Sequence, residues 1–334
     1  MTSTVTSPDT EPAAPRPPRR RRTRAADRGV NRVFRWVATG SGVVILAVLA
    51  AVAIFLVVQA LPAITASSDE LGGAVNRFGE GESLLGFTGP LVFGTLLAAA
   101  LALVLATPVA VGIALFISHY APRRLASALG YVVDLLAAVP SVVFGLWGFL
   151  VLGQNVLKPI WAWLGDVAGW FPLFSGQVSA TGKNLATVAV VLAVMILPII
   201  TAVCREVFLQ TPRLHEEAAL ALGATRWEVV RTAVLPFGRS GIVSAAMLGL
   251  GRALGETMAV LMILSPGFLY SFKILAAGQQ QTIAAYIAAD FPEASGLGVN
   301  TLIATGLALF VITLAVNMFA RWIVARRKDF SGAN

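Results

Sequence analysis

Charged residues are scarce in this chain, and their scarcity excludes most soluble folds. Only 13% of the 334 residues are Asp, Glu, Lys or Arg, whereas 57% are hydrophobic, and the mean hydropathy is +0.79. A soluble domain of this length could not bury so much apolar surface. The composition therefore predicts an integral membrane protein.

Cysteine, histidine and nucleotide-binding motifs are also nearly absent. The one cysteine, Cys204, cannot form a disulfide within the chain. The two histidines, His119 and His215, have no metal-ligand residues at a useful spacing. The run 176–183 resembles a phosphate-binding loop, but it is one residue too long and Asn184 replaces the required Ser or Thr. We therefore expect no metal, cofactor or nucleotide site in this chain.

Long apolar runs dominate the rest of the sequence. Six of them are long enough to cross about 30 Å of hydrocarbon as helices, which predicts an all-α integral membrane protein with six transmembrane helices. We place these spans near 37–60, 92–117, 127–152, 186–208, 240–264 and 300–324. Together they form a predicted permease domain over 37–324, flanked by a tail at 1–36 and a short tail at 325–334.

The basic residues lie mostly on one side of the predicted spans. This asymmetry is typical of cytoplasmic loops, so it predicts that both termini are cytoplasmic. The net charge of +8 then follows from membrane topology, and we expect no nucleic-acid partner. Residues 1–30 are rich in Pro, Arg, Ser and Thr and poor in large apolar side chains, so we expect the tail at 1–36 to be disordered and to contact anionic lipid headgroups.

Between the fourth and fifth spans, residues 211–236 carry the signals of a helix-turn-helix. Thr211 and Pro212 predict a cap and a first helical position, and Gly223 predicts a left-handed residue that ends the first helix. A second short helix follows, and we expect Pro236 to end it ahead of the fifth span.

The second short helix begins with a Thr-x-x-Glu pattern. Thr225 and Glu228 match a capping box, in which each residue bonds to the backbone of the other. The local chemistry leaves two interpretations open: a hairpin that rests on the membrane, and a knob that fits a groove on a soluble motor protein.

Two charged residues stand four apart inside the fifth span. Arg252 lies about a dozen residues from the cytoplasmic end, near mid-membrane, where an arginine costs on the order of 2.5–3.5 kcal/mol. We expect Glu256 to share its helix face and to offset part of this energy. Small residues around the pair would let another helix approach closely. They are Gly249, Gly251, Ala253 and Gly255.

The pair has a structural and a functional interpretation. It could be a salt bridge that only locks two helices together, or it could bind an anion on a transport path. We favour the anion site, because intramembrane ionisable groups mark such paths and the planar fork of Arg252 suits phosphate-like ligands. Glu256 could accept a hydrogen bond from the proton that phosphate keeps at neutral pH, whereas it would repel sulfate. Thr257 completes this group.

A third charge, Asp134, lies in the third span, which we expect to bury it. It could pair with Arg252 across helices or cap a backbone group, and we include it with the substrate-pathway candidates although a structural role is the simpler interpretation. Pro140 follows and predicts a kink in the same span.

Three sequence runs resemble one family of transporters. Glu217-Ala218-Ala219, followed by Gly223, Leu235 and Pro236, resembles the EAA loop of ATP-binding-cassette importer permeases, with Ala233 where isoleucine is usual. The runs 251–260 and 134–145 resemble the phosphate-specific permeases of the PstC type, with Asp134 where that family usually has Glu. The resemblance covers roughly residues 90–325.

The resemblance implies a type I importer permease fold in a bacterial plasma membrane and inorganic phosphate as the transported anion. It implies four partner chains: a second permease of the PstA type, two copies of a PstB-type ATPase and an external phosphate-binding protein of the PstS type. The chain itself would be no enzyme, because ATP hydrolysis would reside in the ATPase. The loop 211–236 would dock on that ATPase. The residues we assign to this coupling are Glu217, Ala218, Ala219, Gly223, Arg226 and Glu228.

Two other functions remain open. The nearer is a permease for another oxyanion, such as sulfate or molybdate. The more distant is a transporter or channel that needs no ATPase.

Overall fold

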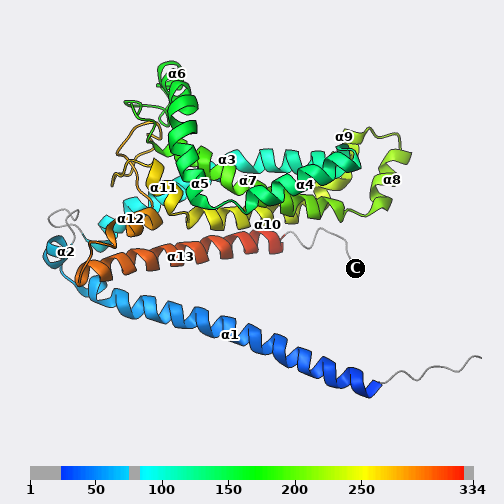
Figure 1. Ribbon diagram of the computed structural model, residues 1–334, viewed down its shortest axis with the longest axis horizontal. Coiled ribbons are helices and arrows are strands. Elements are labelled where there is room, and N and C mark those ends of the chain that lie inside the picture. The colour runs from blue at the N-terminus through cyan, green and yellow to red at the C-terminus, as the bar shows by residue number, and fades with distance from the viewer. Residues whose placement is uncertain (1–23, 75–82, 327–334) are drawn as a thin grey trace, which may run out of the picture. The chain divides into compact units, whose positions relative to one another are not determined.

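The computed structural model describes residues 24–74 and 83–326, and within them every regular element is a helix (Figure 1). Six helices of these residues are long and apolar enough to cross a membrane, which confirms the all-α class and the number of spans. They are Arg32–Thr65, Leu84–Tyr120, Ser141–Ala168, Leu185–Leu209, Arg226–Leu254 and Leu297–Trp322.

The elements follow one another with short π-helical segments between some of them. In chain order they are α1 Arg24–Thr65, α2 Ser68–Ala74, α3 Leu84–Leu115, η1 Phe116–Tyr120, α4 Arg123–Ala137, α5 Ser141–Trp147, η2 Gly148–Leu157, α6 Lys158–Ala168, α7 Leu185–Leu209, α8 Arg213–Ala221, α9 Arg226–Val229, η3 Val230–Val234, α10 Leu235–Leu254, α11 Met258–Ile263, α12 Ile283–Asp290 and α13 Leu297–Arg326.

The chain divides into two units, residues 1–54 and 55–334. The first unit holds most of α1, which begins at Arg24, well before the predicted start of the first span at residue 37. Residues 1–23 of the predicted N-terminal tail and 327–334 of the predicted C-terminal tail lie outside the described residues. All of the sites considered below belong to the second unit.

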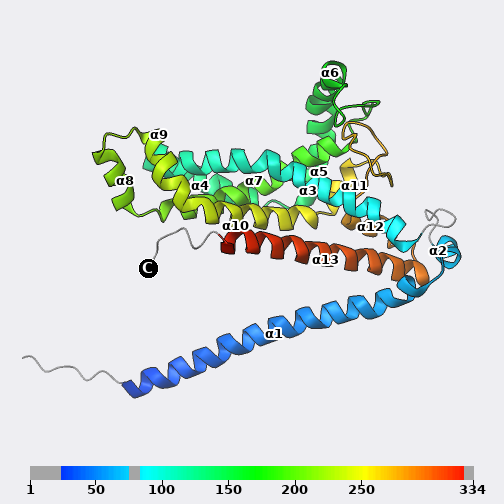
Figure 2. The same cartoon turned by 180° about the vertical axis from the view of Figure 1, so that it is seen from behind.

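In the second unit, α3, α7 and α10 run side by side, and α13 lies beside α10 (Figures 1 and 2). The face of α3 toward this core consists of alanines spaced four residues apart, and small residues allow helix axes to approach closely in a membrane. Bulky side chains of α7 fill the space opposite. The buried residues are Ala98, Ala102, Ala106, Ala110 and Ala114 of α3, and Leu192, Met195, Ile196 and Ile200 of α7.

Glycines of α10 lie against side chains of α7. A Cβ atom added at Gly249 would lie 2.8 Å from Cδ1 of Ile200, and one added at Gly241 would lie 2.5 Å from the methyl groups of Val207. Neither distance is compatible with a real side chain. Gly241 and Gly249 therefore set the separation of α10 and α7.

The predicted third span, 127–152, is wrong as a continuous helix. Helix α4 ends at Ala137 and α5 begins at Ser141, so the chain breaks completely where we expected a kink. Pro140 has no N–H group and disfavours a helical conformation in Val139 before it, which ends α4. After α5, η2 leads into α6, which points away from α3, α7 and α10 in both views (Figures 1 and 2).

A smaller cluster joins the first turns of α3 to α12 and α13. The ring of Phe87 lies 5.5 Å from the rings of both Phe268 and Tyr286, and Leu91, Ile283 and Leu302 are buried around them. Most of the predicted outer loop at 61–91 is helical, because α1 extends to Thr65, α2 follows and α3 begins at Leu84. Residues 75–82 of that loop are outside the described part.

Candidate functional site

The fifth span breaks at the three residues that follow Leu254, so the predicted helix over 240–264 is not continuous. Helix α10 ends at Leu254, and α11 begins at Met258. A continuous helix would need Ala259 N–H to bond to Gly255 O. Instead, the Glu256 carboxylate Oε1 accepts from Ala259 N at 3.1 Å.

The other half of the missing helix bond is also taken by a side chain. The Thr257 hydroxyl Oγ1 donates to Gly255 O at 3.2 Å. Side chains of this kind compete with the backbone and end helices. Glu256 and Thr257 therefore stabilise the break between α10 and α11.

Because of this break, Arg252 and Glu256 do not share a helix face, and that prediction is wrong. Arg252 is half-buried in the last turn of α10, and Glu256 is only 8% exposed. Within residues 32–72 and 83–322, no ion pair joins Arg252 to Glu256 or to Asp134. The carboxylate that we expected to offset the arginine instead caps α11.

Asp134 is exposed on α4, so the prediction that it is buried is wrong. The buried side of α4 consists of Gly130 and Val133 instead. In the described part of the chain, Asp134 pairs with no cation and caps no backbone group. Its carboxylate is free to face another chain or water.

The two broken spans contact each other just beyond their breaks. Helix α11 packs against α5, and a Cβ atom added at Gly145 would lie 2.9 Å from Cα of Ala259. The runs 134–145 and 251–260, which both carry the family resemblance, therefore meet in space. No sequence signal predicted this contact, because more than a hundred residues separate the two runs.

At the other end of α10 lie the two short helices of the loop 211–236. Gly223 has φ +84°, in the left-handed region, as predicted. Two backbone bonds close the turn, from Gly223 N to Leu220 O at 2.9 Å and from Ala224 N to Ala219 O at 3.1 Å. This pair of bonds is a Schellman motif, which satisfies carbonyls at the end of α8.

The predicted capping box at the start of α9 is confirmed. Thr225 N donates to Glu228 Oε2 at 2.7 Å, and Glu228 N donates to Thr225 Oγ1 at 3.4 Å. These bonds fix the direction in which the chain leaves the turn.

Two expected boundaries of this loop are wrong. Pro212, not Thr211, is the cap residue of α8, and the buried Thr211 hydroxyl has no hydrogen-bond partner in the described part. Pro236 does not end the motif, because it lies in the first turn of α10, where a missing N–H is tolerated. Helix α9 thus continues through η3 into α10 as one rod.

The residues predicted to couple to an ATPase remain accessible on this loop. Ala219 is half-buried, and the other five are exposed. The exposed residues are Glu217, Ala218, Gly223, Arg226 and Glu228.

One contact of α8 was missed from the sequence. The His119 ring Nε2, in η1, lies 3.6 Å from Glu216 Oε1, and its Nδ1 lies 2.7 Å from the Ser118 hydroxyl. This contact joins α8 to the end of α3. The residues are far apart in the chain, so only the fold could reveal the pairing.

Comparison with known proteins finds a matching family and close relatives. The family described as binding-protein-dependent transport system inner membrane component matches residues 108–329. The protein named phosphate transport system permease protein PstC 2 of Mycobacterium tuberculosis is 48% identical over 315 residues, covering 90% of this chain and 93% of that one. The one named phosphate transport system permease protein PstC of Mycobacterium leprae is 49% identical over 280 residues, covering 82% of this chain and 87% of its own.

Solved structures with the same fold are more distant. A chain of a bacterial alginate transporter, crystallised with an alginate pentasaccharide-bound periplasmic protein, has a TM-score of 0.53 at 17% identity and covers 89% of this chain and 98% of that one. A second alginate transporter chain has a TM-score of 0.51 at 19% identity, covering 72% and 79%. Both similarities concern the fold alone.

Proposed function

Because the chain belongs to the family of binding-protein-dependent transport system inner membrane components, we propose that it is a permease subunit of an ATP-driven importer of inorganic phosphate. The observation that carries the choice of substrate is the 48–49% identity to the mycobacterial PstC proteins over most of both chains. The six apolar helices agree with a multi-pass protein of the inner membrane.

The transport path passes the break in the fifth span. Discontinuous helices near the midplane are a common site for anions in transporters. Arg252, in the last turn before the break, is a half-buried cation without an ion-pair partner in the part of the chain described here. Such a charge must face protein or water, since contact with lipid is too unfavourable. The same reasoning applies to the exposed Asp134.

Glu256 contributes to the preference for phosphate over sulfate. Its Oε1 atom accepts from Ala259 N and holds α11 in place, so its other oxygen is the one that accepts a hydrogen bond from a protonated oxygen of the anion. Phosphate at neutral pH carries such a proton and sulfate does not. Thr257 fixes the backbone next to this oxygen through its bond to Gly255 O.

The ATPase docks on the exposed residues of the loop 211–236. Closure of the ATPases moves α8 and α9, and the rod from α9 through η3 into α10 carries this movement toward Arg252. The partners are a second permease of the PstA type, an ATPase pair of the PstB type and an external binding protein of the PstS type. ATP binds the ATPase, the chain itself uses no cofactor, and both termini are cytoplasmic.

Uptake by the complete importer in liposomes tests this function. We expect uptake of labelled phosphate to require ATP inside and the binding protein outside, and to resist competition by sulfate or molybdate. Arg252→Gln should lower uptake at least about tenfold, Arg252→Lys should retain part of it, and Glu256→Gln should reduce the preference over sulfate. Arg239→Gln, at an exposed position near the start of the same helix, is the control.

Three results would contradict the proposal. Full uptake by Arg252→Gln would exclude the arginine from the path. Competition by sulfate as strong as by unlabelled phosphate would favour another oxyanion as the substrate. Uptake without ATP would favour a transporter that needs no ATPase.

A further inference from the structure

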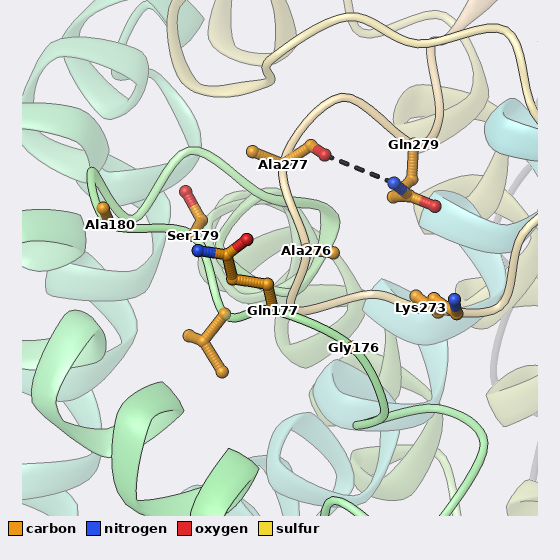
Figure 3. Close-up of a pocket in the computed structure, with 9 residues that line it drawn as sticks. Gly176, Gln177, Ser179, Ala180, Lys273, Ala276, Ala277 and Gln279 are labelled. Carbon is orange, nitrogen blue, oxygen red and sulfur yellow. Dashed lines mark hydrogen bonds between the residues drawn. The ribbon is translucent and has the colours of Figure 1, made fainter.

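A polar pocket lies between two loops that follow α6 and α11 (Figure 3). These loops lie at the end of the second unit that is far from α8 and α9 (Figure 1). The pocket has a volume of about 350 Å³ and none of the predicted site residues lines it. We call it the loop pocket. Its lining consists of Gly176, Gln177, Val178, Ser179, Ala180, Lys273, Ala276, Ala277 and Gln279.

Two loops form the loop pocket, and backbone hydrogen bonds hold them together. Ile274 N donates to Leu173 O at 3.0 Å, and Ser179 N donates to Leu275 O at 2.9 Å. The buried Asn184 side chain Nδ2 adds a third bond, to Leu275 O at 3.1 Å. The pocket is therefore a fixed feature of the fold, since its two walls cannot separate without breaking these bonds.

The charge in the loop pocket is of one sign. Lys273 is the one ionisable residue among the nine that line it, and no carboxylate faces it from that lining. Gln177 supplies an amide N–H₂ group and Ser179 a hydroxyl, which lies 3.4 Å from the Thr181 hydroxyl, whereas the Gln279 amide nitrogen donates to Ala277 O at 3.4 Å (Figure 3). A cation with two neutral donors and no carboxylate in the lining is a suitable set for a small oxyanion.

Gly176 determines where Lys273 lies. A Cβ atom added at Gly176 would lie 3.2 Å from Cδ of Lys273, so the lysine stem lies against a position that has no side chain. The φ of Gly176 is +94°, which other residues rarely adopt. The glycine thus leaves room for the stem of Lys273, an exposed residue of the lining.

We propose that the loop pocket binds inorganic phosphate, or an oxyanion of the same shape, before the anion enters the path at Arg252. This inference rests on the proposed function, because it places a second anion site on the same route. An alternative ligand with the same charge is a carboxylate of a docking binding protein. We favour the free anion because Lys273 is the one charged group of the lining and the polar side chains of Gln177 and Ser179 lie in the same lining.

Cysteine labelling of the complete importer in liposomes tests the site. The native Cys204 is buried in α7, so a new cysteine reports without interference from it. We introduce Gln177→Cys in the pocket, Ala180→Cys as a second reporter that keeps Gln177, and Ser295→Cys in the exposed loop before α13 as the control. The reaction rate with a membrane-impermeant thiol reagent is then measured with increasing inorganic phosphate.

We expect phosphate to slow the reaction at positions 177 and 180 about fivefold and to leave position 295 unchanged. Lys273→Gln and Gly176→Ala should remove this protection. Lys158→Gln should keep it, because Lys158 is an exposed cation outside the lining.

Absence of protection at both reporters would overturn the proposal, and so would equal protection in Lys273→Gln. Protection by the phosphate-free binding protein, with none by phosphate alone, would overturn it in favour of a docking contact. ATP-driven phosphate uptake is measured on the same liposomes. Uptake without protection would contradict only the proposal of an anion site in the loop pocket. Protection without uptake would contradict the proposed function.

Discussion

At the scale of single residues, the fifth span shows how two side chains can end a helix inside an apolar run. Glu256 and Thr257 each take one partner of the hydrogen bond that a continuous helix would make at Ala259. Spacing along the sequence predicted a shared face for Arg252 and Glu256, because it assumed that the helix continued. A carboxylate three residues before a backbone N–H is a local capping signal, and it could have been recognised.

Removing this cap should destabilise the chain measurably. Glu256→Ala leaves Ala259 N–H without its partner in a buried site, and we expect a loss of about 1 kcal/mol in stability. Glu256→Gln should lose less, because its amide oxygen still accepts the bond. The thermal unfolding of the purified complex measures both changes.

Comparison of these two variants separates capping from transport. If Glu256→Gln is as stable as the parent but has lost its preference for phosphate over sulfate, both roles of the residue hold. Equal stability of Glu256→Ala and the parent would mean that the bond between Glu256 Oε1 and Ala259 N contributes nothing to stability.

At the scale of elements, the loop 211–236 was the most predictable part of the chain. The left-handed Gly223 and the capping box at Thr225 depend on residues within one turn, so their signals survive in any tertiary context. The expectations for Thr211 and Pro236 failed because they also used only local signals. Whether a proline ends one helix or opens the next depends on the neighbouring span, which local signals do not include.

Proline at position 223 should disconnect the loop from its ATPase. Gly223→Pro cannot adopt φ +84° and removes the N–H that donates to Leu220 O, so the turn between α8 and α9 must change. We expect loss of ATPase co-purification. Gly223→Ala adds a Cβ that meets nothing within 4 Å, so only the backbone strain of about 1–2 kcal/mol remains and docking should be weakened less.

Arg239→Gln is the control, because Arg239 is exposed but lies outside the loop 211–236. Glu217→Lys tests the docking surface itself and should also lose the ATPase. Retained co-purification in both Gly223→Pro and Glu217→Lys would exclude this loop as the docking site.

The contact between His119 and Glu216 should matter much less than the turn. Its atoms are 3.6 Å apart and its partners are partly exposed, and such pairs contribute about 0–1 kcal/mol. We therefore expect His119→Gln and Glu216→Gln each to lower uptake by no more than about fivefold. A double-mutant cycle on uptake measures their coupling, and a tenfold loss in both single variants that the double variant does not deepen would contradict this expectation.

At the scale of the whole molecule, composition predicted the six spans because apolar length is a property of each span alone. It could not predict the contact of α5 with α11, which depends on how the broken spans pack. Nor could it predict that Asp134 is exposed, since burial is decided by neighbours from distant parts of the chain. The run 176–183 resembles a phosphate-binding loop only in part, and the sequence could not show that residues 273–279 form the other wall of the loop pocket beside it.

Substitutions at two glycines of α10 should have different effects, one on folding of the chain and the other on assembly with a second permease. A Cβ at Gly249 would clash with Ile200, whereas a Cβ at Gly251 meets nothing within 4 Å in this chain. We therefore expect Gly249→Val to reduce the amount of folded protein. Gly251→Val should fold but pair poorly with the second permease, if the face of α10 that holds Gly251 receives it.

Co-expression with a tagged second permease measures both effects, as total folded chain by size-exclusion chromatography and as the fraction retained on the tag. Gly72→Val is the control, because a Cβ there also meets nothing within 4 Å but the position lies in α2, away from α10. Because Gly251 stands next to Arg252, a pairing defect confined to Gly251→Val would also locate the arginine close to the boundary between the two permeases. Full pairing by Gly251→Val would instead require the second permease to approach from another side of the molecule.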